Sequence, residues 1–237
     1  MALRMTNAWL WIGCIVAICG CGAEGQPLPP VQPAASPTDS APPSPQLNGR
    51  IVTFLRTQDP AWAALEGDQL DRVDAVSLRK DYTPDDLALL AHLPGLTTLR
   101  IVRSGETFAK PAPRRAPTDA DLAVIGRLRG LHTLQIGGWS APYSGAALAS
   151  LRNLANLRDL SVFSTPSVND EALEHLLHIT SLERLDVTYT KVTDRGLTRL
   201  LELPHLKTVR FGWAADSRRA LARFRAAHPD APFTIEP

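Results

Sequence analysis

The feature that most restricts the fold is an apolar pattern that recurs along the chain. At residues 182–187 the apolar positions are Leu182, Leu185 and Val187, which fits one short strand. The same pattern occurs at 73/76/78, 96/99/101, 131/134/136, 157/160/162 and 206/209/211, with a partial copy at 233/235. Successive copies begin 23, 35, 26, 25 and 24 residues apart, and repetition at this period predicts a solenoid.

The second half of each unit predicts a capped helix. A side chain that can accept a hydrogen bond from a helix N-terminus precedes each helical segment. These positions are Thr83, Thr118, Ser144, Asn169, Thr193 and Asp216. Apolar pairs at helical spacing follow them at Leu87/Leu90, Leu122/Ile125, Leu148/Leu151, Leu173/Leu176, Leu197/Leu200 and Leu221/Phe224. Each unit is therefore predicted to be a strand, a turn and a helix.

The pattern LxxLxLxxTxVTDxGLxxLxxL of residues 182–203 resembles a leucine-rich repeat of the ribonuclease-inhibitor-like kind. The resemblance covers residues 73–237 and implies an α/β solenoid of about six to seven coils, with a parallel sheet on the concave side and helices on the convex side. The ninth position departs from the Asn or Cys of that family, because Thr190, Thr165 and Trp139 stand there. We therefore expect the polar ladder at this position to be irregular. Residues 50–72 are predicted to cover the N-terminal end of the stack, with a short helix opening at Asp59-Pro60.

The first residues are predicted to export and anchor the chain. Residues 1–21 have one positive charge at Arg4 and then an apolar run, which is the order of a secretory signal. Ile18-Cys19-Gly20-Cys21 resembles the lipobox of bacterial lipoproteins, although Cys19 departs from the usual small residue. The resemblance implies that Cys21 carries the lipid and that the protein is held at the cell envelope, at the outer membrane where one exists, facing the periplasm or the surface. Ordinary secretion with cleavage elsewhere is the alternative.

A proline-rich segment separates the signal from the repeats. Residues 22–49 contain eight of the 20 prolines and few residues that could form a core. Such a composition favours an extended, disordered tether. A proline-rich ligand for a recognition domain is the alternative.

Composition argues against several functions. The chain has 25 Lys and Arg against 24 Asp and Glu, and this balance does not favour a nucleic-acid surface. All three cysteines lie within residues 1–21, so the repeats have no thiol nucleophile. Glu171, His175 and His178 share a helix face, which we interpret as solvated rather than metal-binding. No Gly-x-Ser-x-Gly motif or phosphate-binding loop is present. We expect neither an enzyme nor a cofactor or metal.

Binding therefore depends on the surface. Strand side chains alternate, so Asp159, Arg184, Asp186 and Arg210 are expected on the concave face, where Asp159 can neutralise Arg184 and Asp186 can neutralise Arg210. Phe163, Tyr189 and Trp213 are expected to be exposed in successive coils. We predict that these three aromatics, with Arg184 and Arg210, bind a protein or peptide, because aromatics and Arg carry much of the energy of interfaces.

These predictions define a monomeric, membrane-anchored protein-binding module. The alternative is a structural envelope lipoprotein without a specific ligand, and a hydrolase is a third hypothesis. The segment 103–117 is an insertion in the second repeat. It is either a tolerated surface loop or a binding element.

Overall fold

The computed structural model describes residues 44–102, 115–138, 143–212 and 216–236. The chain divides into two compact units, Met1–Ala41 and Pro42–Pro237, and the described residues all belong to the second. Cys21 and Trp213 lie outside the described residues, as does most of the predicted insertion.

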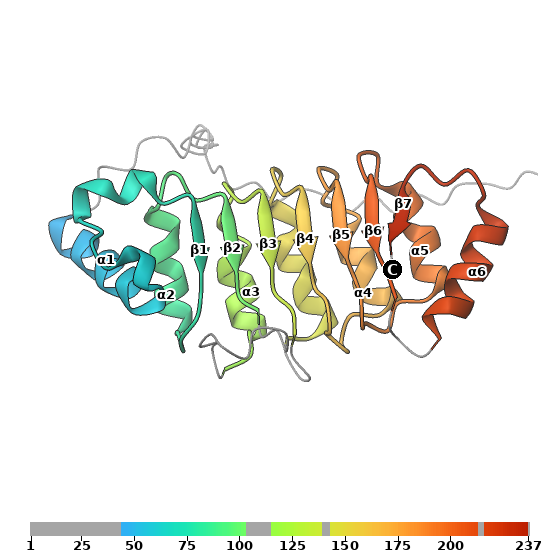
Figure 1. The fold of residues 1–237 in the computed structure, drawn as a ribbon, viewed down its shortest axis with the longest axis horizontal. Helices are drawn as coiled ribbons and strands as arrows, with labels where there is room; N and C mark the ends of the chain where they lie inside the picture. The colour runs from blue at the N-terminus through green and yellow to red at the C-terminus, as the bar shows by residue number, and fades with distance from the viewer. Residues whose placement is uncertain (1–43, 103–114, 139–142, 213–215, 237) are drawn as a thin grey trace, which may run out of the picture. The chain divides into compact units, whose positions relative to one another are not determined.

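The second unit is built on one sheet of seven parallel strands whose order follows the sequence (Figure 1). The strands are β1 (Ala75–Ser77), β2 (Thr98–Arg100), β3 (Thr133–Gln135), β4 (Asp159–Ser161), β5 (Arg184–Asp186), β6 (Thr208–Arg210) and β7 (Thr234–Glu236). Their register pairs equivalent repeat positions, so that Leu160 of β4 lies opposite Leu134 and Leu185. The predicted leucine-rich-repeat solenoid is confirmed.

Helices cover one side of this sheet, as Figure 1 shows. The α-helices are α1 (Pro45–Gln58), α2 (Pro84–Leu89), α3 (Asp119–Ile125), α4 (Asp170–Leu176), α5 (Asp194–Arg199) and α6 (Ser217–Ala227). The 3-10 helices are η1 (Pro60–Trp62), η2 (Gly67–Arg72), η3 (Leu90–His92), η5 (Gly145–Asn153) and η6 (Leu200–Glu202). Short helices need tertiary packing for stability, so the stacked core rather than intrinsic propensity holds them.

The predicted caps are confirmed as the residues that precede the helices. Thr83, Thr118, Asn169 and Thr193 each accept a hydrogen bond from a backbone N–H of the first turn. The remaining two positions, Ser144 and Asp216, precede η5 and α6 without a side-chain bond of this kind. Side-chain capping typically contributes about 1 kcal/mol to a helix.

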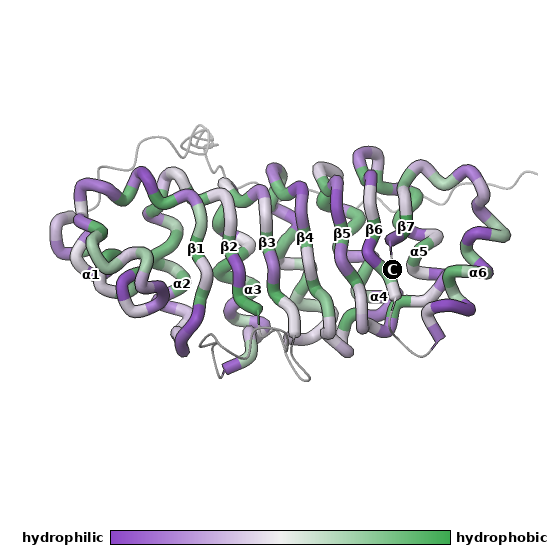
Figure 2. Tube along the Cα trace, viewed as in Figure 1, coloured by the Kyte–Doolittle hydropathy of each residue, from purple (hydrophilic) through white to green (hydrophobic). Residues whose placement is uncertain are grey.

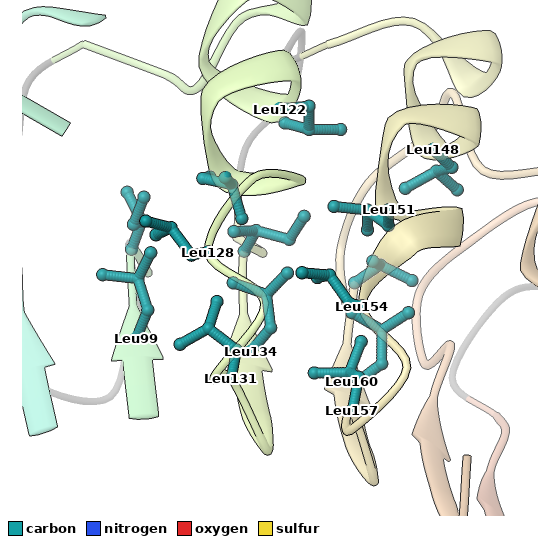
Figure 3. Packing of buried hydrophobic residues seen from close by; sticks show 14 of the residues in the cluster. Leu99, Leu122, Leu128, Leu131, Leu134, Leu148, Leu151, Leu154, Leu157 and Leu160 are labelled. Carbon is teal, nitrogen blue, oxygen red and sulfur yellow. The ribbon is translucent and has the colours of Figure 1, made fainter. Parts of the chain in front are cut away.

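The core consists of the predicted apolar positions. The central strand residues Leu99, Leu134 and Leu160 are buried, and they contact leucines of the neighbouring coils and of the helices above them (Figure 3). Most of the predicted helix positions are buried in the same way. Leu221 is the exception, because it is only partly buried in α6 while Ala220 and Phe224 face the core.

The ninth repeat position does not form a ladder between coils where it is described. The hydroxyl of Thr190 donates to the carbonyl oxygen of Val187 at 2.6 Å, and that of Thr165 donates to the carbonyl oxygen of Phe163 at 3.2 Å. Both bonds lie within one coil. Because both hydroxyls are used within their own coil, the predicted irregularity of the ladder is confirmed.

Aspartates at the first helical position fasten one coil to the next instead. Asp170 of α4 accepts hydrogen bonds from the backbone N–H of Thr193 at 2.8 Å and from its hydroxyl at 2.7 Å. Asp119 of α3 accepts the equivalent pair from Ser144, at 2.6 and 2.8 Å. These bonds between coils were not predicted, because capping arguments consider only the helix that a residue begins.

The N-terminal end of the stack differs from the prediction. The helix α1 begins at Pro45 rather than near residue 50, so residues 45–49 are helical and are not part of an extended tether. Ser44 accepts a hydrogen bond from the N–H of Leu47, and Pro45 occupies a first-turn position that needs no N–H donor. The buried Gln58 accepts hydrogen bonds from the backbone N–H groups of Arg79 and Lys80, just after β1. The predicted short helix at Asp59-Pro60 is present as η1.

The C-terminal end is closed by α6 and β7, as the sequence predicts. Phe224 and Phe233 are buried and stack with ring centroids 5.9 Å apart. The helices in the described part of the chain include none with the length and apolarity that a membrane span requires.

Replacing Leu185 by Ala should destabilise the fold by about 2–5 kcal/mol, because the side chain is buried between coils and its loss leaves a cavity. Denaturant unfolding followed by circular dichroism measures the change. The control is the same substitution at Leu201, which is only partly buried. Equal losses at the two sites would contradict the register described above.

Two glycine substitutions test how closely the coils approach. Gly126 has the helical φ of −61°, where Ala is ordinarily favourable, but a Cβ there would lie 2.1 Å from the carbonyl oxygen of Ser150. Gly126→Ala should therefore lower the unfolding midpoint. Gly49 lies inside α1, and a Cβ at this position would have no atom within 4 Å. Gly49→Ala should therefore raise the free energy of unfolding by roughly 0.5–1 kcal/mol. A stabilising Gly126→Ala would show that the coils are further apart.

Candidate functional site

The open face of the sheet, which the sequence predicts to be concave, carries the side chains of the outer residues of each strand. The middle residue of each strand points into the core, so the first and third residues project from the other face. The strand register aligns them in two rows. One row contains Thr133, Asp159, Arg184 and Thr208, and the other contains Gln135, Ser161, Asp186, Arg210 and Glu236.

Both predicted ion pairs are present on this face. The Nη2 of Arg184 donates to the Oδ2 of Asp159 at 2.7 Å, and a second contact joins its Nε to Oδ1. The Nη1 of Arg210 lies 3.2 Å from the Oδ2 of Asp186. The hydrogen bond to Asp159 raises the pKa of Arg184 above its usual value. The two arginines are therefore neutralised within the protein.

A further row of charges at the start of the strands was not predicted. The Nζ of Lys207 donates to the Oε2 of Glu183 at 2.6 Å, and the Nε of Arg158 lies 3.9 Å from the Oε1 of Glu183. The hydrogen bond from Lys207 lowers the pKa of Glu183 below its usual range. Each of these residues immediately precedes a strand, so their alternating sign at one repeat position was the signal that could have revealed them.

Charges at equivalent positions of the adjacent coils of β4, β5 and β6 thus have opposite signs. Arg158 and Asp159 have opposite signs along one coil, and Glu183 and Arg184 reverse them in the next. These charges of β4, β5 and β6 are paired with one another, so this part of the open face has little field that could attract a charged ligand from a distance.

A shallow cavity of about 240 Å³ lies on the open face. Its lining runs from β3 to β7 and includes Gln135, Asp159, Arg184, Asp186, Arg210 and Glu236. Arg184 and Arg210 of the predicted binding set therefore line one groove, whereas Phe163 and Tyr189 do not line it.

The aromatics are not equivalent in the structure. Tyr189 is 52% exposed, the largest exposure of a bulky apolar side chain among the described residues. Phe163 is only partly exposed. Its ring lies over Gly137 of the preceding coil, since a Cβ at Gly137 would lie 2.5 Å from the Cδ1 of Phe163. Phe163 therefore packs back towards β3, away from the coil of Tyr189, and the expected exposure of all three rings is wrong for Phe163. Trp213 lies outside the described residues.

The local backbone explains why Tyr189 is presented differently. Gly138, Ser164 and Tyr189 occupy the same position in successive coils and have left-handed φ angles of 88°, 51° and 55°. Such a conformation costs a residue other than glycine roughly 1–2 kcal/mol. A strained residue that is also exposed is a reason to suspect a functional role.

Arg115, near the C-terminal end of the insertion, is held by Asp81, Tyr82 and Asp121. Its Nη2 lies 2.8 Å from the Oδ2 of the fully buried Asp121, and its guanidinium carbon lies 5.0 Å from the ring centroid of Tyr82. Its backbone N–H donates to Asp81 at 3.2 Å. Burial raises the pKa of Tyr82 above its usual value. These contacts hold the end of the insertion, and sequence periodicity gave no sign of them.

The described residues contain no cluster of three or more His, Cys, Asp or Glu side chains that could hold a metal ion. Of the predicted solvated group, Glu171 and His175 belong to α4, and Glu171 is exposed while His175 is partly exposed. His178 is exposed but lies beyond the end of α4, so the expected helix face does not include it.

Similarity of this chain to known proteins is found among solved structures. The described sheet and helices define a leucine-rich-repeat solenoid. No protein-family model matches the chain, and no curated protein matches it. Among solved structures, it is similar to an internalin (inlF) of Listeria monocytogenes, at 17% identity over 81% of this chain and 57% of that chain, with a TM-score of 0.44. It is also similar to internalin C2 of the same organism, at 17% identity over 83% of this chain and 99% of that chain, with a TM-score of 0.36.

The shared left-handed position can be tested at Ser164. Ser164→Gly should raise the free energy of unfolding by about 1 kcal/mol, because glycine adopts φ of 51° without strain. The control, Ser161→Gly within β4, should lower it by roughly 0.5–1 kcal/mol. Urea denaturation measures both values. A loss of stability at Ser164 would indicate that this backbone conformation is not strained.

Proposed function

We propose that this protein is a lipid-anchored binding module that holds a protein or peptide on the open face of its sheet. The observation that carries the proposal is Tyr189, an exposed aromatic held in a left-handed conformation shortly after β5. Asp186, at the end of the same strand, lines the groove. Tyr189 follows this lining residue by three positions in the sequence.

The groove has room for an extended segment of a partner. It crosses five strands, and parallel strands lie about 4.8 Å apart, so it extends for roughly 20 Å. A specific interface buries about 800 Å² on each partner, so contacts would extend beyond the groove to Tyr189 and its surroundings. Aromatic and Arg side chains commonly dominate the energy of such contacts.

The ion pairs of the open face restrict the chemistry of the partner. Because Arg184 and Arg210 already bind Asp159 and Asp186, a strongly charged ligand would have to break these pairs. A near-neutral segment that offers hydrogen-bonding groups would keep them. We therefore expect the affinity to depend only weakly on salt concentration.

Attachment to the membrane is the second part of the proposal. It is supported by the lipobox-like sequence that ends at Cys21 and by the proline-rich segment between Cys21 and Ser44. One acyl chain binds membranes only marginally, whereas two or more anchor a protein stably. The proposed location is the cell envelope, at the outer membrane where one exists.

Affinity capture tests the binding function. The detergent-solubilised full chain should recover a stoichiometric partner from envelope extract, and Tyr189→Ser should weaken binding by about 2 kcal/mol, or roughly 30-fold, if Tyr189 is a hot spot. Tyr189→Phe keeps the ring and should bind nearly normally. Trp213→Ala tests the remaining predicted aromatic. Isothermal titration with the recovered partner measures the affinities.

Arg152→Ala, at the end of η5 on the helix side, is the control for a general surface effect. Recovery of the same partner by Tyr189→Ser at wild-type affinity would refute the role of Tyr189. Failure to recover any stoichiometric partner would favour a structural envelope protein.

Metabolic labelling tests the anchor. Labelled palmitate should be incorporated into the wild-type chain and not into Cys21→Ser, because the thiol is the proposed site of acylation. Cys21→Ser should then leave the membrane fraction or accumulate as an uncleaved precursor. A mature Cys21→Ser protein that still sediments with membranes would contradict the lipid anchor, and Cys14→Ser serves as the control.

A further inference from the structure

The outward face of α6 is the most strongly basic helix surface in the described part of the chain. Ser217, Ala220 and Phe224 face the core. The exposed residues are Arg218, Arg219, Ala222, Arg223, Arg225, Ala226 and Ala227. No Asp or Glu occurs between Ser217 and Ala227. Figure 2 shows strongly hydrophilic stretches along α6 at the C-terminal end of the row of coils.

The geometry of the helix makes this face broad. At 3.6 residues per turn, Arg218 and Arg225 lie along one margin and Arg219 and Arg223 along the other. Ala222 and Ala226 lie between the margins. Since alanine side chains are short, nothing on the face keeps a flat object away from the four guanidinium groups.

Three of these arginines have no acidic partner. Arg223 donates through Nε to the Oδ2 of Asp194 at 2.9 Å, and this bond lowers the pKa of Asp194. Within the described part of the chain, Arg218, Arg219 and Arg225 form no ion pair or side-chain hydrogen bond. By contrast, Arg199 of α5 is bound by Glu174 and Glu202, both at 2.8 Å or less. The charge of α6 is therefore largely unpaired, unlike that of Arg184 and Arg210 on the open face.

We propose that the outward face of α6 docks on a membrane surface that contains anionic phospholipids. Guanidinium groups form paired hydrogen bonds with phosphate oxygens, and a planar array of phosphates matches a broad face with short side chains at its centre. Each basic residue near an anionic bilayer increases binding about fivefold, so three together contribute roughly 100-fold. This is a weak interaction by itself.

The inference rests on the proposed lipid anchor for its local concentration. A chain already held at the bilayer needs only a weak second contact to settle on it, because stable attachment commonly combines two signals. The helices α1 and α6 lie at opposite ends of the row of coils (Figure 1). Contact of α6 with the bilayer would bring the C-terminal end of this row to the membrane.

Hydrogen exchange of the full chain tests the contact. Phosphatidylcholine vesicles with and without phosphatidylglycerol are added in excess, and mass spectrometry follows the backbone amides of α6. We expect several-fold slower exchange in α6 only with phosphatidylglycerol, and high salt should abolish the effect because it screens the charges. The variant R218Q/R219Q/R225Q should lose this slowing.

A matched variant controls for total charge. The control positions are three exposed arginines in the coils of α3 and η5, namely Arg127, Arg129 and Arg152. All three can be changed to Gln together. This variant should retain the slowing at α6. Circular dichroism shows whether each variant is folded, and slowing at helices outside α6 in a variant would reveal a different docking face and overturn the proposal.

The remaining outcomes separate this inference from the anchor. If the chain stays with both kinds of vesicle but α6 exchanges equally on them, the α6 contact is refuted and the anchor stands. If the chain leaves neutral vesicles yet α6 is slowed by phosphatidylglycerol, the anchor is refuted and the contact stands. Slowing that needs no vesicles and grows with protein concentration would assign the face to a second copy of the chain and overturn the proposal.

Discussion

No single coil of this protein can bury its own leucines, and the rest of the structure depends on this constraint. A strand of three residues and a helix of six or seven form a unit with an apolar side and no layer to cover it. Stacking supplies that layer, because the leucines of β4 contact those of β3 and β5. The stack also fixes the register, which places chemically equivalent positions side by side. The ion pairs of the open face follow from this register.

Much of the fold could be predicted because it depends on local patterns that repeat. The buried strand positions, the caps before the helices and the pairing of Asp159 with Arg184 all follow from the repeat period and from strand alternation. The start of α1 was misplaced because Pro45 was grouped with the prolines of the tether. Once Ser44 is recognised as a cap, the same Pro marks the first turn of a helix.

The candidate site was harder to predict, because its details depend on backbone angles and on contacts between coils. The repeat pattern predicted that Phe163 and Tyr189, at outward positions of successive coils, would both be exposed. The structure places Phe163 over Gly137, where the absence of a side chain makes room for it, and holds Tyr189 in a left-handed turn. Neither property follows from hydrophobic periodicity. The result is a protein with two different surfaces, a neutral open face and a basic terminal helix, although its total charge is close to balanced.

The aspartates that begin α3, α4 and α5 have a consequence for how such a chain can evolve. Each one binds a residue of the following coil, namely Ser144, Thr193 or Arg223. A duplicated segment of 24–26 residues would therefore bring its own fastening, and the number of coils can change without the invention of a new interface. At the start of α2 this aspartate is replaced by Pro84, and the long insertion follows in the next coil. There Arg115 joins Asp81 and Tyr82 to Asp121 instead, so this junction is held without the aspartate bond between coils.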